Sequence, residues 1–142
     1  MRTTVLANGC FDLFHIGHLY YLQASRALGD VLVVSVTEDA WVDKGPGRPV
    51  FPLEQRMEML RALAIVDSVI ATTTPEEAIN KIRPNTYTKG VEYAGILREQ
   101  GLVESYGGQV VFIDRPKYSS SELLARSGKS IPSYRDWGRN TR

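Results

Sequence analysis

The segment that most limits the possible folds is the nearly continuous apolar run Val-Leu-Val-Val-Ser-Val at residues 31–36. A short strand with no polar alternation is expected where both faces of a parallel sheet are covered. Four other short segments also predict strands, namely residues 3–7, 68–73, 86–89 and 109–114. The chain therefore has enough strand segments for one covered sheet.

Helical segments separate these strands. Amphipathic or capped patterns predict helices over residues 16–28, 52–64, 75–83 and 94–106, and a last helix opening at the capping box 119–122. Pro52 suits the first position of its helix, and residues 74–77 form another capping box. Parallel neighbours need crossover connections. The sequence therefore predicts an α/β protein: a single domain with a Rossmann-like, doubly wound, five-stranded parallel sheet.

Size and composition exclude several classes of protein. The 142 residues suit one domain, with its main unit at 1–127 and a basic tail at 128–142. The formal net charge of +1 gives no electrostatic support for a nucleic-acid or membrane partner. The single cysteine excludes an internal disulfide, and no stretch has the length of a membrane span or a signal-peptide core. We expect a cytoplasmic protein, whose tail is either an extended arm or a frayed end.

Both histidines of the chain, His15 and His18, lie at the start of a predicted helix, after a strand and a turn that contains Gly9. The first-turn amides and the positive end of the helix dipole attract anions, and imidazoles can add hydrogen bonds to phosphate oxygens. Residues spaced i and i+3 share one helix face, and Gly17 leaves room for a nucleotide against the backbone. The alternative is that the two histidines are surface or capping residues.

Other candidate residues lie elsewhere in the chain, and Lys89-Gly90 and the serine run at 119–121 also follow predicted strands, so they can converge with the histidine motif at the carboxyl edge of the sheet. Lys44 and Arg48 lie in a Gly/Pro-rich loop that could close over a triphosphate, unless it is an ordinary solvated loop. Arg56 extends toward the same phosphates or pairs with Glu54 or Asp39. The serines Ser119, Ser120 and Ser121 form either an anion site or a plain helix cap. Lys89 with Gly90 forms either a phosphate loop or an exposed turn. Asp12 either orients a substrate or caps the following helix.

The run Gly9-Cys10-Phe11-Asp12 followed by His15-Ile16-Gly17-His18 resembles the signature of the nucleotidyltransferase superfamily. The chain is most similar to the heptose-1-phosphate adenylyltransferases and the glycerol-3-phosphate cytidylyltransferases. This resemblance covers residues 3–126 and also includes residues 47–50, 54–56, 88–93 and 118–121. In this superfamily the two histidines grip the nucleoside triphosphate.

The resemblance implies an enzyme that transfers a nucleoside monophosphate from ATP or CTP to a sugar or polyol phosphate and releases pyrophosphate. ATP is favoured, because the opening motif and Lys89-Gly90 look heptose-like. Mg²⁺ is expected on the phosphates with no dedicated protein metal site, and a homodimer is implied. The implied roles are catalytic for His15, His18, Lys44 and Ser120; nucleotide-binding for Gly9, Cys10, Phe11, Gly17, Arg48, Arg56, Lys89, Gly90, Ser119 and Ser121; and substrate-binding for Asp12, Lys44 and Glu92.

Three alternatives stay open. The first is a cytidylyltransferase acting on glycerol-3-phosphate or another polyol or amino-alcohol phosphate. The second is a translation enzyme, since His-Ile-Gly-His also matches the signature of class I aminoacyl-tRNA synthetases. The third is a nucleotide-binding module without catalysis.

Overall fold

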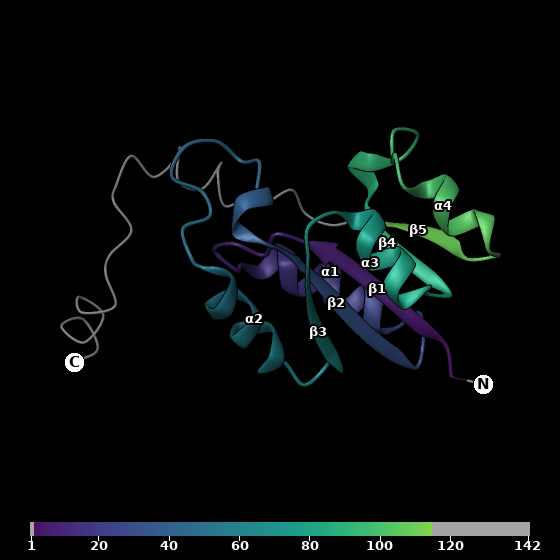
Figure 1. Cartoon of the computed structure of the whole chain (residues 1–142). Helices are drawn as coiled ribbons and strands as arrows, with labels where there is room; N and C mark the ends of the chain where they lie inside the picture. Colours follow the sequence, from purple (N-terminus) through teal and green to yellow (C-terminus); the bar gives the residue numbers. More distant parts are fainter. Residues whose placement is uncertain (1, 115–142) are drawn as a thin grey trace.

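Five parallel strands form one sheet in the order β3-β2-β1-β4-β5 (Figure 1). This computed structural model describes residues 2–114, so Ser119 to Ser121, the predicted last helix and the basic tail lie outside the described residues. The elements are β1 (Thr4–Gly9), α1 (Ile16–Arg26), β2 (Val31–Thr37), the 3₁₀ turn η1 (Asp39–Trp41), α2 (Leu53–Arg61), β3 (Ser68–Thr72), α3 (Pro75–Ile82), β4 (Thr86–Gly90), the 3₁₀ turn η2 (Val91–Tyr93), α4 (Gln100–Ser105) and β5 (Gln109–Ile113).

The central strand is β1, which pairs with β2 on one side and with β4 on the other. The chain first adds β2 and β3 on one side of β1 and then returns to add β4 and β5 on the other. The strand order thus reverses between β1 and β4. In open α/β sheets, the crevice at the carboxyl ends of the strands beside such a reversal is where ligands bind.

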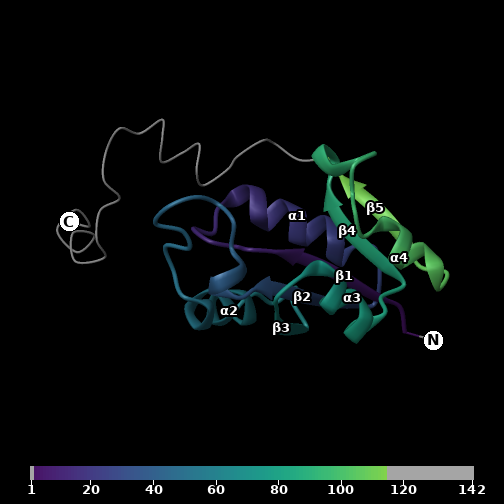
Figure 2. The same cartoon turned by 45° about the horizontal axis from the view of Figure 1, so that its top comes forward.

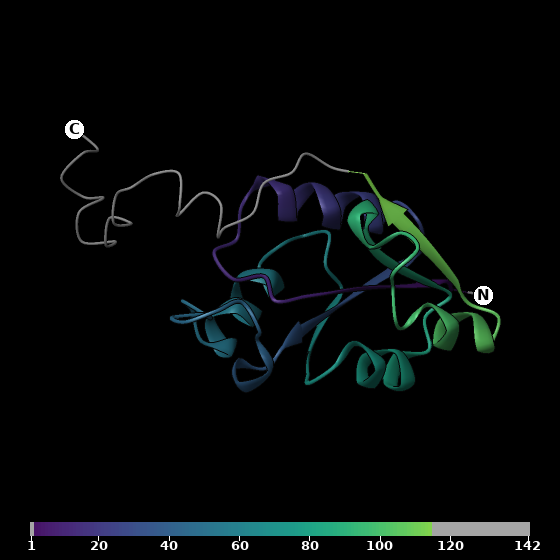
Figure 3. The same cartoon turned by 90° about the horizontal axis from the view of Figure 1, so that it is seen from above.

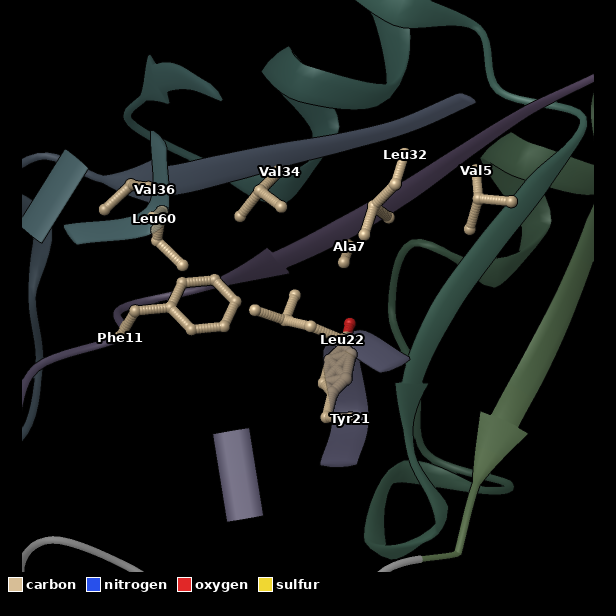
Figure 4. Packing of buried hydrophobic residues seen from close by; sticks show 9 residues of the cluster. All are labelled: Val5, Ala7, Phe11, Tyr21, Leu22, Leu32, Val34, Val36 and Leu60. Carbon is tan, nitrogen blue, oxygen red and sulfur yellow. The ribbon is translucent and has the colours of Figure 1, made fainter. Parts of the chain in front are cut away.

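Helices cover both faces of the sheet, as Figure 3 shows from above. On one face, Tyr21 and Leu22 of α1 and Leu60 of α2 pack on apolar side chains of β1 and β2 (Figure 4). On the other face, Ile79 of α3 and Val103 of α4 pack with side chains of the strands. The predicted doubly wound, five-stranded α/β fold is confirmed.

Two predicted helices are shorter than expected by more than two residues. The helix predicted for residues 52–64 spans Leu53–Arg61, and Pro52 is its N-cap instead of its first helical residue. The following residues are good helix formers, but Leu63, Ile65 and Val66 turn inward and pack on the first core. Tertiary packing here outweighs helix propensity.

The helix predicted for residues 94–106 is wrong in its first half. The chain instead forms η2 and a turn in which Gly95 has a φ of +83°, and Leu97 enters the second core. Only residues 100–105 are helical. A glycine with positive φ inside an otherwise helical pattern is a strong local breaker.

The capping box predicted at residues 74–77 is half formed. The Thr74 hydroxyl accepts from the Glu77 amide at 3.3 Å, and Pro75 is the first helical residue. The Glu77 carboxylate accepts instead from the amide and hydroxyl of Thr73. The helix therefore begins where the sequence predicted, with a different partner for its glutamate.

Candidate functional site

A pocket of about 260 Å³ opens at the carboxyl ends of β1, β2 and β4, beside the reversal of strand order. The turn after β1 and the loop between β2 and α2 lie at this same end of the sheet (Figure 2). The pocket is lined by Asn8, Gly9, Cys10, Phe11, His18, Tyr21, Thr37, Trp41, Val42, Asp43, Lys44, Lys89, Gly90 and Tyr93. Segments far apart in the sequence therefore meet there, as the strand pattern predicted.

The two histidines cap the first helix for each other. His15 is the N-cap of α1, and its Nδ1 accepts from the Gly17 amide at 3.0 Å. The His15 amide donates to Nδ1 of His18 at 3.1 Å. The capping alternative of the sequence analysis is thus confirmed.

These hydrogen bonds fix the chemical form of both rings. A nitrogen that accepts an N–H cannot carry a proton itself, so each neutral imidazole carries its proton on Nε2. The two rings are stacked with centroids 3.9 Å apart, and the rings of Phe11 and Phe14 also contact the His18 ring. The result is two N–H donors held as a pair at the positive end of a helix.

Lys89 adds a cation on the β4 side of the pocket. Its Nζ lies 3.2 Å from Oδ1 of Asn8 and 5.1 Å from the centre of the Tyr93 ring. The Asn8 amide is held in turn by a 2.7 Å hydrogen bond to the Ser35 hydroxyl. A Cβ at Gly90 would clash with the Glu92 carboxylate, so this turn brings Glu92 beside the backbone of the pocket rim.

Asp12 is buried and binds the loop between β2 and α2. Its carboxylate accepts from Nε of Arg48 at 2.8 Å and from the amides of Val50 at 2.7 Å and Phe51 at 2.9 Å. Burial acts to raise the pKa of Asp12, but these donors outweigh it and hold the pKa below its usual range. Since the N-cap of α1 is His15, the proposed capping role of Asp12 is wrong.

Arg56 is buried beneath the pocket. Its guanidinium donates to the carbonyls of Cys10, Thr37 and Phe51 and pairs with the Asp39 carboxylate at 2.6 Å. Of the two predictions for Arg56, the pair with Asp39 is confirmed. The guanidinium ties the ends of β1 and β2 together and does not line the pocket.

Cys10 lines the pocket beside these groups. Burial, more than any other influence, raises the pKa of its thiol above the ordinary value. The thiol therefore stays protonated near neutral pH, which fits the prediction of a small packed residue.

The structure brings only part of the predicted set into the pocket wall. The members in the wall are Gly9, Cys10, Phe11, His18, Lys44, Lys89 and Gly90. The members outside it are Asp12, His15, Gly17, Arg48, Arg56 and Glu92. Ser119, Ser120 and Ser121 lie outside the described residues.

Sequence reasoning missed several residues of the wall. Trp41 and Asp43 belong to the loop after β2, and Tyr93 belongs to the turn after β4. The available signal was their place just beyond strands that flank β1, because the carboxyl ends of those strands form the pocket.

The fold and the site together define a nucleotide-binding α/β domain. The family model described as Cytidylyltransferase-like matches residues 6–126, so the chain belongs to this family of nucleotidyltransferases. No helix among residues 2–114 is both long and apolar enough to cross a membrane.

Two curated relatives carry the name bifunctional protein HldE. The chain is 50% identical to the protein of Streptomyces coelicolor over 133 residues, which cover 89% of this chain and 29% of that protein. It is 44% identical to that of Syntrophotalea carbinolica over 118 residues, which cover 80% of this chain and 24% of that protein. The chain thus spans less than a third of the length of these relatives.

A solved structure agrees with the fold. The lipopolysaccharide core biosynthesis protein of Thermoplasma volcanium aligns with a TM-score of 0.68 and 29% identity, covering 84% of this chain and all of that one. The pantoate-beta-alanine ligase of Francisella tularensis aligns with a TM-score of 0.61 and 12% identity, covering 89% of this chain and 69% of that one, which shows the fold alone.

Proposed function

We propose that this domain transfers a nucleoside monophosphate from ATP to a sugar or polyol phosphate and releases pyrophosphate. The observation that carries the proposal is the stacked pair His15 and His18 at the start of α1, beside a pocket that also holds Lys44 and Lys89. Two paired N–H donors at a helix N-terminus, with two lysines in the wall of the pocket beside them, suit a polyphosphate and a second anionic substrate.

In the proposed reaction, a phosphate oxygen of the acceptor attacks the α-phosphorus of the triphosphate. One P–O bond forms, and the bond between the α-phosphorus and the bridging oxygen of the pyrophosphate breaks, with the electron pair leaving on pyrophosphate. The attacking phosphate is already an anion near neutral pH, so this chemistry needs positioning and charge stabilisation more than a strong base.

Each side chain has a proposed part in this reaction. Nε2–H of His15 and His18 donates to phosphate oxygens, whose negative charge grows in the transition state. Lys44, on the loop, neutralises the departing pyrophosphate, and Lys89 binds the acceptor phosphate. Ser120 is proposed to contribute a hydroxyl to the β- and γ-phosphates, although it lies outside the described residues.

The donor set of the pocket fits a magnesium ion whose ligands come mainly from the substrate and from water. Among residues 2–114, no group of three or more His, Cys, Asp or Glu side chains could hold a metal, and Asp43 supplies a carboxylate to the wall. Such a site suits an ion held mainly by phosphate oxygens and water, with Asp43 as the nearby protein oxygen. When bound there, Mg²⁺ would neutralise phosphate charge.

The test is release of pyrophosphate from ATP and from CTP, each with sugar 1-phosphates and glycerol 3-phosphate. CTP is the second candidate, because the matching family model is described as Cytidylyltransferase-like. The proposal would be supported by pyrophosphate release with one combination of nucleotide and acceptor, provided that the release is lost in His18→Ala and kept in Arg98→Gln. Arg98 is a matched surface control in an exposed ion pair with Glu76. Nucleotide binding without release on the whole panel would favour a non-catalytic module.

Two further parts of the proposal rest on the family resemblance. A homodimer is proposed, and light scattering on the purified chain would measure the mass that tests it. The cytoplasmic location stays a prediction, which cell fractionation would test.

A further inference from the structure

The loop between β2 and α2 carries Lys44 to the pocket, and the core holds this loop at two places. Its exposed tip, residues 44–47, includes Gly45 and Gly47 at φ values of +94° and +76°. A Cβ at either glycine would meet no described atom within 4 Å. Within residues 2–114 the tip therefore has few contacts of its own, and its place depends on what holds the two sides of the loop.

Arg56 holds the side of the loop that leaves β2. It pairs with Asp39 and donates to the Thr37 carbonyl, and the same guanidinium nitrogen donates to the Cys10 carbonyl. The start of the loop is thus fixed to the turn that follows β1.

Asp12 holds the side of the loop that enters α2. Its side chain is fully buried, and the Arg48 side chain that it binds is 7% exposed. The carboxylate also accepts both the Val50 and Phe51 amides, which precede the N-cap of α2. We call these four groups the Asp12 clasp: the Asp12 carboxylate, the Arg48 side chain and the amides of Val50 and Phe51.

The backbone around Asp12 is shaped for this contact. Phe11 and Leu13, its two neighbours, both have positive φ, at 52° and 51°. Such angles are uncommon for residues with bulky side chains, and they persist where the surrounding structure enforces them. Asp12 therefore lies in a sharp turn three residues before the first histidine, with its carboxylate under the loop.

A residue that binds the substrate should present its charged group to the pocket. Asp12 and Arg48 are absent from the pocket wall, whereas Lys44 and Asp43 of the same loop are part of it. The carboxylate and the guanidinium are instead bound to each other between the histidine turn and the loop.

We propose that Asp12 and Arg48 are positioning residues, whose clasp holds the loop so that Lys44 stays at the pocket during nucleotidyl transfer. This inference rests on the function proposed above. It replaces the roles that the sequence suggested for these two residues, substrate binding for Asp12 and phosphate binding for Arg48. The turn that holds Asp12 before His15 and the loop that carries Lys44 then act as one unit, because the clasp joins them.

The experiment combines Asp12→Asn, Arg48→Gln and Lys44→Ala, singly and in pairs, with Arg98→Gln as the matched control. Each clasp variant should lower kcat about 10²-fold, the cost of misplacing a group by about 1 Å, with little change in either KM. The pair Asp12→Asn with Arg48→Gln should be no slower than the slower single variant. Lys44→Ala should slow the wild type but not slow Arg48→Gln any further.

The opposite pattern would overturn the inference. If the costs of Asp12→Asn and Arg48→Gln multiply, or if Arg48→Gln raises the KM for nucleotide at unchanged kcat, the two residues bind substrate independently. Should Asp12→Asn fail to fold, the cycle of Arg48→Gln with Lys44→Ala supplies the same comparison. Arg48→Lys, which keeps the charge beside Asp12, should then recover part of the lost kcat.

Amide hydrogen exchange separates failure of this inference from failure of the proposed function. In Arg48→Gln the Val50 and Phe51 amides should exchange faster than in the wild type, although they donate to Asp12 and not to Arg48. Unchanged exchange at both amides would overturn the clasp. A wild-type protein that releases no pyrophosphate, with faster exchange in this variant, would refute the function and leave the clasp in place.

Discussion

Replacing His18 by asparagine and by alanine separates the two tasks of its imidazole. In the structure Nδ1 accepts the His15 amide, which leaves Nε2–H as the donor. The Oδ1 atom of asparagine sits one bond beyond Cγ, as Nδ1 does in histidine, so it can accept the same amide. Asparagine has no donor at the distance of Nε2, and alanine has neither group.

The expected magnitudes follow from these contacts. Both variants lose the donor and should lower turnover about 10²–10³-fold, as for loss of one transition-state hydrogen bond. Both also lose the ring contacts with His15, Phe11 and Phe14, so the difference between them isolates the cap. A helix cap contributes about 1 kcal/mol. Alanine should therefore melt about 2–4 °C below asparagine.

The assay pairs steady-state pyrophosphate release with thermal unfolding of the same preparations. Wild-type turnover in His18→Asn would refute the donor role, because the cap alone would then suffice. Equal melting temperatures for the two variants would refute the capping geometry, whatever their activity.

Three other predictions concern stability. Leu22→Ala should destabilise the domain by about 2–5 kcal/mol in urea unfolding, since Leu22 is fully buried in the first core, and a loss below about 1 kcal/mol would contradict that packing. Tyr87→Phe should cost about 1–3 kcal/mol in the same assay, because the buried Glu99 carboxylate loses the hydroxyl that donates to it at 3.0 Å; an unchanged midpoint would contradict this contact. The lowered pKa of Asp12 means that its ionised form stabilises the fold above about pH 4 and that this contribution is lost as the pH falls through the folded pKa. Asp12→Asn should therefore flatten the loss of unfolding free energy between about pH 5 and pH 2, and an unchanged slope would show that Asp12 titrates as it does in the unfolded chain.

The sheet was predictable because its signal is local and repeated. Most strands are short runs rich in apolar residues between turn residues, and β2 (Val31–Thr37) is buried on both faces along residues 32–36. The errors fall where tertiary contacts decide. Leu63 leaves its helix to join the first core, and Leu97 leaves a predicted helix to join the second.

The site was predictable as a location and less so as a set of roles. Strand ends and charged loops placed Lys44 and Lys89 at one edge, and both line the pocket. The sequence could not tell that Asp12 and Arg48 bind each other 36 positions apart. Charged residues in a basic loop and an acid after a strand carry no local sign of their partners, because an ion pair depends on the path of the loop.

The histidine turn shows why a helix cap and a binding site can be mistaken for alternatives. Ser, Thr, Asp and Asn are the usual N-caps, yet the N-cap of α1 is the imidazole of His15. An imidazole has two ring nitrogens, so one can accept from the backbone while the other carries the proton and can donate. A serine at residue 15 would cap the helix as well but would offer no second donor at that reach. Under the proposed function, the same side chain would both cap the helix and donate to a phosphate, and a hydroxyl or a carboxylate at this position would not supply both at that reach.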